Sequence, residues 1–198
     1  MTEGQSPKHT PSPGLWVLLA GGILAGILMA ILTVAWGRSN TPLPSKLGGD
    51  APTSIPARAA VGQLAPSFSA DTSDGKTLTL DELRGTPVAL NFWATWCAPC
   101  RAEMPELQSA VTRYADQGLV VLGIDASESA EQVEAYMDDL ALTFPSVIDP
   151  DGSIAILYGV YAFPTTIWLD AEGIVRIRHL GALTKDDIDR YMADLVGQ

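Results

Sequence analysis

The feature that most constrains this chain is a long uncharged segment near its N-terminus. No charged residue occurs from Thr10 to Gly37, and the 22 residues from Leu15 to Trp36 are almost all apolar. As an α-helix this stretch would be roughly 33 Å long, which is enough to cross the hydrocarbon core of a bilayer. Trp16 and Trp36 stand at its two ends, where indole rings favour the membrane interface. The sequence therefore predicts a transmembrane anchor helix at residues 15–36.

A cleaved signal peptide is the alternative for this segment. The apolar core of a signal peptide is usually about 7–15 residues long and ends at small residues. Here the core is longer, and Trp36 and Arg38 stand where a cleavage site would need small side chains. We therefore expect an uncleaved signal-anchor that follows an N-terminal tail at residues 1–14. Positive charges lie on both sides of it, so charge alone leaves its orientation open.

Residues 37–60 contain four prolines among small and polar residues and have no hydrophobic periodicity. This composition predicts a flexible Pro-rich linker. Residues 1–60 carry a net charge of +2 and the whole chain −11, so the predicted soluble domain at residues 61–198 carries −13. Such a domain repels phosphate backbones, which argues against a nucleic-acid partner. The acidity either maintains solubility or attracts basic client proteins.

Hydrophobic patterning in this domain alternates between strand and helix. It predicts strands at residues 67–71, 76–80, 87–93, 119–125, 165–170 and 174–179, a helical turn at 81–84, and helices at 102–114, 130–140 and 186–196. The short segments 146–148 and 154–158 fit either state. This order predicts an α/β fold in which a central mixed β-sheet is flanked by helices on both faces.

The two cysteines of the chain lie between the strand at 87–93 and the next helix, as Cys97-Ala98-Pro99-Cys100. A sulfur at a helix N-terminus meets unpaired N–H groups and the positive end of the dipole, so its pKa falls below about 8.5. The thiolate attacks disulfide sulfurs. We expect Cys97 to form a mixed disulfide with a client and Cys100 to resolve it. Two cysteines cannot complete a zinc site and nothing near them has ligand spacing, so no metal or cofactor is expected.

The residues around this pair resemble the thioredoxin superfamily. The run Asn91-Phe92-Trp93-Ala94-Thr95-Trp96 precedes the cysteines, Pro105 follows them in the helix, and Phe163-Pro164-Thr165 resembles the cis-proline loop of the family. The resemblance implies a thioredoxin-like fold over residues 61–196 and a redox-active Cys97–Cys100 disulfide. It also implies that the Phe163–Pro164 peptide bond is cis and faces the cysteines.

Within the superfamily the chain looks most like the membrane-anchored TlpA/ResA-like proteins. The anchor, the run from Asn91 to Pro105 and extra residues between Asp125 and Asp149 carry this likeness. It implies a single-pass protein of the cell membrane with its thioredoxin-like domain on the extracytoplasmic, periplasmic side. The implied activity is reduction of client disulfides, such as those of apocytochrome c during cytochrome c maturation, with electrons from a membrane thiol protein.

The resemblance also assigns further site residues. Asn91 stands where cytoplasmic thioredoxins carry a buried Asp, and Asn cannot take a proton. Glu103, one helical turn after Cys100, matches an acid of the TlpA/ResA-like group and becomes the third candidate catalytic residue; a solvated helical glutamate is the alternative. Trp96, Phe163 and Pro164 are the candidate substrate-binding residues.

Two other functions stay open at this point. A peroxiredoxin-like peroxide reductase usually carries Thr three residues before its reactive Cys, and Ala94 stands there instead. A non-enzymatic copper-delivery or binding module would need Met or His around the cysteines, and only Met104 is close. Neither the client, the electron donor nor the reduction potential follows from the sequence.

Overall fold

A central five-stranded sheet organises residues 59–197, the part of the chain that this computed structural model describes. Its strands lie in the order β5 (Ser146–Asp149), β4 (Val120–Ala126), β3 (Val88–Trp93), β6 (Thr165–Leu169) and β7 (Val175–Leu180). Strands β3, β4 and β5 run parallel, whereas β6 runs antiparallel to both β3 and β7. The predicted mixed sheet is confirmed.

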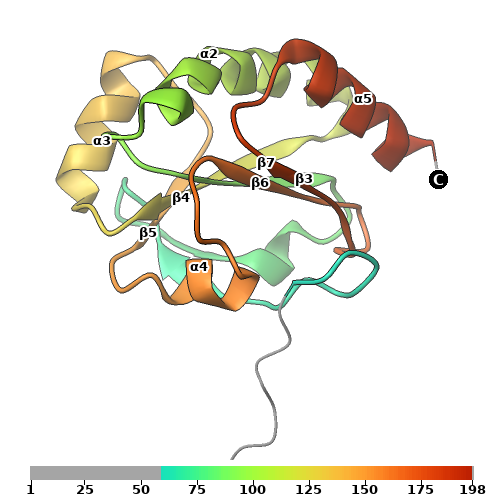
Figure 1. Ribbon diagram of the computed structural model, residues 1–198, viewed down its shortest axis with the longest axis horizontal. Helices are drawn as coiled ribbons and strands as arrows, with labels where there is room; N and C mark the ends of the chain where they lie inside the picture. Colours follow the sequence, from blue (N-terminus) through green and yellow to red (C-terminus); the bar gives the residue numbers. More distant parts are fainter. Residues whose placement is uncertain (1–58, 198) are drawn as a thin grey trace, which may run out of the picture. The chain divides into compact units, whose positions relative to one another are not determined.

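Helices cover both faces of this sheet (Figure 1). Helices α2 (Ala98–Arg113), α3 (Ala130–Asp139) and α5 (Lys185–Val196) lie over one face, and α4 (Ser153–Tyr158) lies over the other. A hairpin of β1 (Ser69–Asp71) and β2 (Thr77–Thr79) leads into the 3₁₀ helix η1 (Leu80–Leu83), and a second 3₁₀ helix, η2 (Ala115–Gln117), follows α2. No helix within residues 59–197 is long and apolar enough to cross a bilayer. The predicted anchor at residues 15–36 lies outside the described residues.

Strand β3 connects the two layers of the core. All six of its residues are buried, as expected for a central strand with helices on both faces. Because side chains alternate along a strand, Ala89 and Trp93 pack under α2, while Leu90 and Phe92 pack toward α4. Asn91 faces the same side as Ala89 and Trp93, so β3 places one polar side chain beneath α2.

Helix α2 begins four residues earlier than the apolar periodicity indicated. Cys97 is its N-cap residue, and Cys97 Sγ accepts a hydrogen bond from Cys100 N–H at 3.3 Å. Pro99 fits the first turn because its missing N–H would have no helical partner there. Apolar periodicity missed this turn because a cap and a proline define it. The sequence predicts a kink at Pro105, because proline lacks the helical N–H donor and clashes one turn back. The helix continues through this residue, and the kink itself stays a prediction.

The sequence predicts Thr184 as the cap of the last helix and leaves Ser127 or Ser129 for the helix before it; the structure confirms Thr184 and selects Ser129. Ser129 caps α3 in a reciprocal pair with Gln132, and Thr184 caps α5 in the same way with Asp187. Each pair satisfies N–H groups that the first turn of a helix leaves without partners. The cap at Thr184 fixes the position of the loop that precedes α5, and that loop reaches the active site.

The ambiguous segments become strand β5 and helix α4. The buried Asp149 carboxylate ends β5 and accepts hydrogen bonds from the N–H groups of Ile154 and Ala155 in the first turn of α4. Packing begins at Ala59, which is buried and whose carbonyl accepts from the Arg178 guanidinium. The divisions of the chain at residues 14, 36 and 60 stay predictions.

Candidate active site

The cysteine pair lies where β3 gives way to α2, and the two sulfurs form a disulfide. Both residues are buried in this oxidised state, but Cys97 retains 6 % exposure and Cys100 none. The predicted pairing is therefore confirmed. The difference in exposure fits an outer sulfur that meets a client and an inner sulfur that resolves the mixed disulfide.

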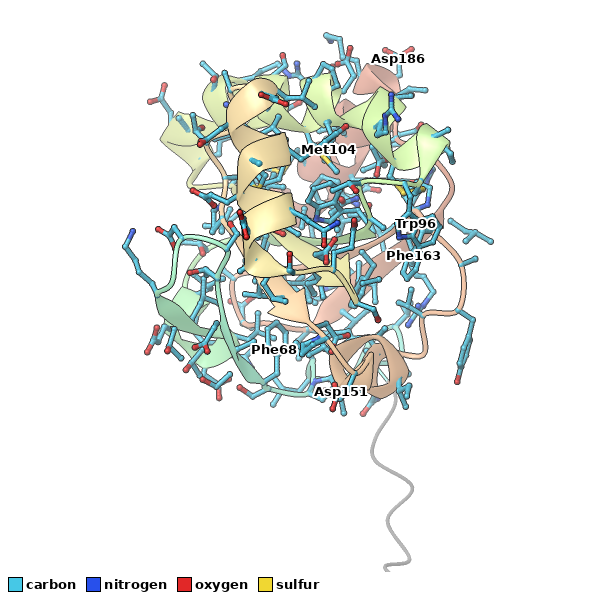
Figure 2. All side chains as sticks on the ribbon, turned by 90° about the vertical axis from the view of Figure 1, so that its left-hand side faces the viewer. Phe68, Trp96, Met104, Asp151, Phe163 and Asp186 are labelled. Atoms are coloured by element: carbon cyan, nitrogen blue, oxygen red, sulfur yellow. A yellow bond between two sulfur atoms is a disulfide. The ribbon has the colours of Figure 1, made fainter. Side chains whose placement is uncertain are left out.

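Two aromatic side chains stand at the rim of this site. Trp96, which is 65 % exposed, meets Phe163 edge-to-face with the ring centroids 6.1 Å apart, and Figure 2 shows the two side by side. The Phe163–Pro164 peptide bond is cis, as predicted. Because Phe92 pairs with Thr165, the buried Pro164 lies level with the end of β3, from which the cysteine loop departs. The structure thus gathers all three candidate substrate-binding residues at one edge of the sheet.

Glu103 is almost fully buried beneath α2, with 1 % exposure. Its Oε1 accepts from Asn91 Nδ2 at 2.8 Å, and its Oε2 accepts from the backbone N–H of Leu183 at 2.7 Å. Asn91 Nδ2 also donates to Thr166 Oγ1 at 2.9 Å. The alternative of a solvated helical glutamate is therefore wrong, because strand β3 and the loop before α5 enclose this carboxyl group.

The surroundings of Glu103 give it a pKa suited to proton exchange. Burial raises the pKa of Glu103 to about 7, although the hydrogen bonds from Leu183 and Asn91 lower it. Near neutral pH this carboxyl group is therefore protonated in part of the population. Such a group can both give and accept a proton, which is what general acid–base catalysis requires. Asn91 carries no proton for transfer, but it orients the group that does.

Sequence reasoning missed a second carboxyl cluster on the other side of the cysteine loop. The Glu128 carboxylate accepts hydrogen bonds from both the backbone N–H and the hydroxyl of Thr95, at 2.6 Å and 2.5 Å. Behind it, Asp125 is fully buried, and its Oδ1 accepts from Glu128 N–H at 3.0 Å. Burial, the Glu128 side chain and the charge of Asp149 raise the pKa of Asp125 to about 8. The one feature of the sequence that could have indicated this cluster is Asp125, an acid at the end of the apolar strand at residues 119–125.

Comparison with known proteins assigns the chain to a family. The AhpC/TSA family model matches residues 61–178. The chain belongs to the AhpC/TSA family. It is 38 % identical over 174 residues to thioredoxin-like protein YneN of Bacillus subtilis, an alignment that covers 85 % of this chain and 95 % of that protein. To thiol-disulfide oxidoreductase ResA of Geobacillus thermodenitrificans it is 38 % identical over 136 residues, covering 69 % and 78 %.

Solved structures agree with this assignment to the thioredoxin-like proteins of the AhpC/TSA family. A thiol:disulfide interchange protein of the thioredoxin family from Chlorobium tepidum superposes with a TM-score of 0.64 at 30 % identity, over 70 % of this chain and 99 % of that one. The protein is therefore an enzyme, a thiol–disulfide oxidoreductase of the ResA type, and it acts on disulfide-bearing client proteins. Within residues 59–197, no group of three or more His, Cys, Asp or Glu side chains could hold a metal ion.

Proposed function

We propose that this protein is a membrane-tethered reductase for disulfides of extracytoplasmic clients, such as apocytochrome c during cytochrome c maturation. The observation that carries the proposal is the buried Glu103 beneath the Cys97–Cys100 disulfide, with a pKa of about 7. A reductase must move protons each time its sulfurs change partners, and this carboxyl group sits one helical turn from Cys100. The ResA relatives and the apolar segment at residues 15–36 support the tethered, extracytoplasmic setting.

The first half of the cycle uses the outer sulfur. A client disulfide docks against Trp96 and Phe163, and the Cys97 thiolate attacks one of its sulfurs. A bond forms between Cys97 Sγ and that sulfur while the client S–S bond breaks, and the other client sulfur leaves as a thiolate that takes up a proton. The helix N-terminus at Cys97 favours the attacking thiolate.

The second half uses the inner sulfur. Ionised Glu103 accepts the Cys100 thiol proton, and the Cys100 thiolate attacks Cys97 Sγ. The Cys97–Cys100 disulfide re-forms as the client thiol leaves, and protonated Glu103 returns a proton to the departing sulfur. Two electrons have then passed to the client. A membrane thiol protein supplies the next two by exchanging thiols with the Cys97–Cys100 disulfide.

Trapping separates the two sulfurs experimentally. Cys100→Ser should accumulate mixed disulfides with clients through Cys97, whereas the matched Cys97→Ser variant should trap few. The reduction potential tests the direction of the reaction. We expect a value well below the roughly −120 mV of a dedicated oxidase. Equilibration with glutathione that returned a value near that figure would overturn the reductase assignment.

Topology is tested separately. With the N-terminus in the cytoplasm and the domain outside, protease added to cells with permeable outer layers should digest residues 61–198. Protection of the domain until the inner membrane is lysed would contradict the proposed orientation while leaving the redox chemistry in place.

A further inference from the structure

The contact between Glu128 and Thr95 lies outside the cycle described above, and it acts on the cysteine loop directly. Thr95 is two residues before Cys97 and adjacent to Trp96, so its position affects both the attacking sulfur and the docking aromatic. Glu128 accepts two hydrogen bonds from this one residue, one from the backbone and one from the side chain. Hydrogen bonds to an ionised carboxylate are roughly twice as strong as neutral ones, so the two hydrogen bonds from Thr95 are strongest when Glu128 is charged.

A second acid, Asp125, lies directly behind Glu128. Asp125 is fully buried at the end of β4, and its Oδ2 receives no hydrogen bond from any donor in residues 59–197. The charged groups that act on Asp125 are both negative: Glu128 from the loop before α3, and Asp149 from β5. Asp149 is engaged by the first turn of α4. A buried acid whose charged neighbours are both acids keeps its own proton at neutral pH and can donate it to a neighbouring carboxylate.

We propose that Glu128 is a positioning residue for the reactive cysteine loop, and that Asp125 and Glu128 hold one proton between them. The proton resides on Asp125, and charged Glu128 holds Thr95 by its N–H and hydroxyl. When Asp125 loses its proton, its buried negative charge faces the half-buried carboxylate of Glu128, and the hold on Thr95 weakens. This inference needs only the disulfide exchange of the family, and it does not depend on the client or on the membrane.

The Thr95 amide proton reports this contact directly. In the oxidised full-length protein the cysteines do not titrate, so the Thr95 amide resonance can be followed by NMR from about pH 6 to about pH 9.5. We expect a low-field signal that titrates with a midpoint near 8, following Asp125. Asp125→Asn should abolish the titration and keep the low-field position, whereas Glu128→Gln should move the signal upfield. A flat wild-type signal, or a titration that survives Asp125→Asn, would overturn the proposal.

A rate measurement tests whether Glu128 positions the cysteine loop for reaction. The rate of reaction with a cyclic disulfide peptide is measured on the reduced protein and divided by the thiolate fraction of Cys97, which removes changes in thiol pKa. Glu128→Gln should lower this rate per thiolate on the order of fivefold at neutral pH, because a loosened loop misplaces the attacking sulfur. The exposed Glu131→Gln, the same chemical change three residues along, is the matched control and should not alter it.

Thr95→Val keeps the proposal testable if Glu128→Gln does not fold. It removes only the hydroxyl donor, preserves side-chain shape and leaves the N–H contact, so a smaller loss in the rate per thiolate is expected. A wild-type rate in both Glu128→Gln and Thr95→Val would mean that Glu128 does not position the loop.

Discussion

Two buried carboxyl groups flank the cysteine loop, and their surroundings differ. Glu103 on α2 has neutral donors at both oxygens, from Asn91 and the Leu183 backbone. Asp125 on β4 receives one N–H and otherwise faces the negative side chains of Glu128 and Asp149. Burial raises the pKa of both, to about 7 for Glu103 and about 8 for Asp125. Burial alone therefore does not distinguish the roles of the two carboxyl groups. The hydrogen-bond donors and charged side chains around each group do.

Neutral donors stabilise the carboxylate of Glu103 enough for it to change protonation near neutral pH. At Asp125, burial together with negative neighbours raises the pKa further, to about 8. In the roles proposed above, Glu103 exchanges protons with the sulfurs, whereas Asp125 keeps its proton at neutral pH and supports the contact between Glu128 and Thr95. The predictions that follow test this division of roles.

The largest expected effect is that of Glu103→Gln on turnover. Loss of a general acid–base group should slow release of the reduced client from the mixed disulfide by about 10- to 100-fold, at or below the usual range for such groups. Removal of its negative charge should also shift the thiol titration to lower pH. Stopped-flow measurement of release from a disulfide peptide would check this. The control is Glu106→Gln, which changes a half-buried glutamate one turn further along α2. If the thiol titration curves and the turnover of Glu103→Gln equal those of the wild type, Glu103 is not catalytic.

A somewhat smaller effect is expected on the pH dependence of stability in the oxidised protein. A carboxyl group with a raised folded-state pKa stabilises the fold fully below its unfolded pKa, and this stability is lost as the pH rises through the folded value. For Glu103, whose pKa rises from 4.5 to about 7, the loss should be about 2 kcal/mol between about pH 5 and about pH 8. Urea unfolding across this range measures it.

Variants distinguish the contributions of the two carboxyl groups to this pH dependence. Glu103→Gln should reduce the loss of stability up to about pH 7 and leave the loss above it, whereas Asp125→Asn should reduce the loss across the same range and on through about pH 8. If Glu103→Gln leaves the pH dependence unchanged, Glu103 does not carry the raised pKa.

The smallest expected effect is that of Asn91→Leu. Glu103 and Thr166 would each lose a donor, while the Asn91 Oδ1, which accepts no hydrogen bond from residues 59–197, would be removed. These changes partly offset, so we expect about 1 kcal/mol of destabilisation. The pKa of Glu103 should rise further, and the pH profile of client release should move to higher pH with it. An unchanged profile would show that Asn91 does not tune Glu103.

Much of the architecture could be predicted because its causes are local. The caps at Ser129 and Thr184, the β1–β2 hairpin and the apolar run of β3 are each determined by residues close in sequence. Helix α4 could not be predicted, because six residues show no distinct period. Its first turn is held by Asp149, which reaches it only in the folded chain.

The residues of the site likewise differ in whether nearby sequence or only the folded chain reveals them. The cysteine pair and the cis bond at Pro164 were located by motif, and both are confirmed. Glu103 was located by resemblance, but its partner Leu183 lies 80 residues away and donates through its backbone, so no side-chain pattern could reveal it. Thr95 and Glu128 lie 33 residues apart on different loops, and only the pairing of β3 with β4 brings them together.

The first described residues have a mechanical consequence. They run along β7: Gly62 N–H donates to the Val175 carbonyl at 2.7 Å, Val175 N–H donates to the Gln63 carbonyl at 2.9 Å, and the Arg178 side chain donates to the Ala59 carbonyl at 3.2 Å. Ala59 packs into the core on the α4 face. A pull on the chain at Ala59 would act first on these bonds, which attach residues 59–63 to the edge strand β7. Strand β6 separates β7 from β3, after which the cysteine loop begins, so the first bonds under load are not those that hold the redox pair.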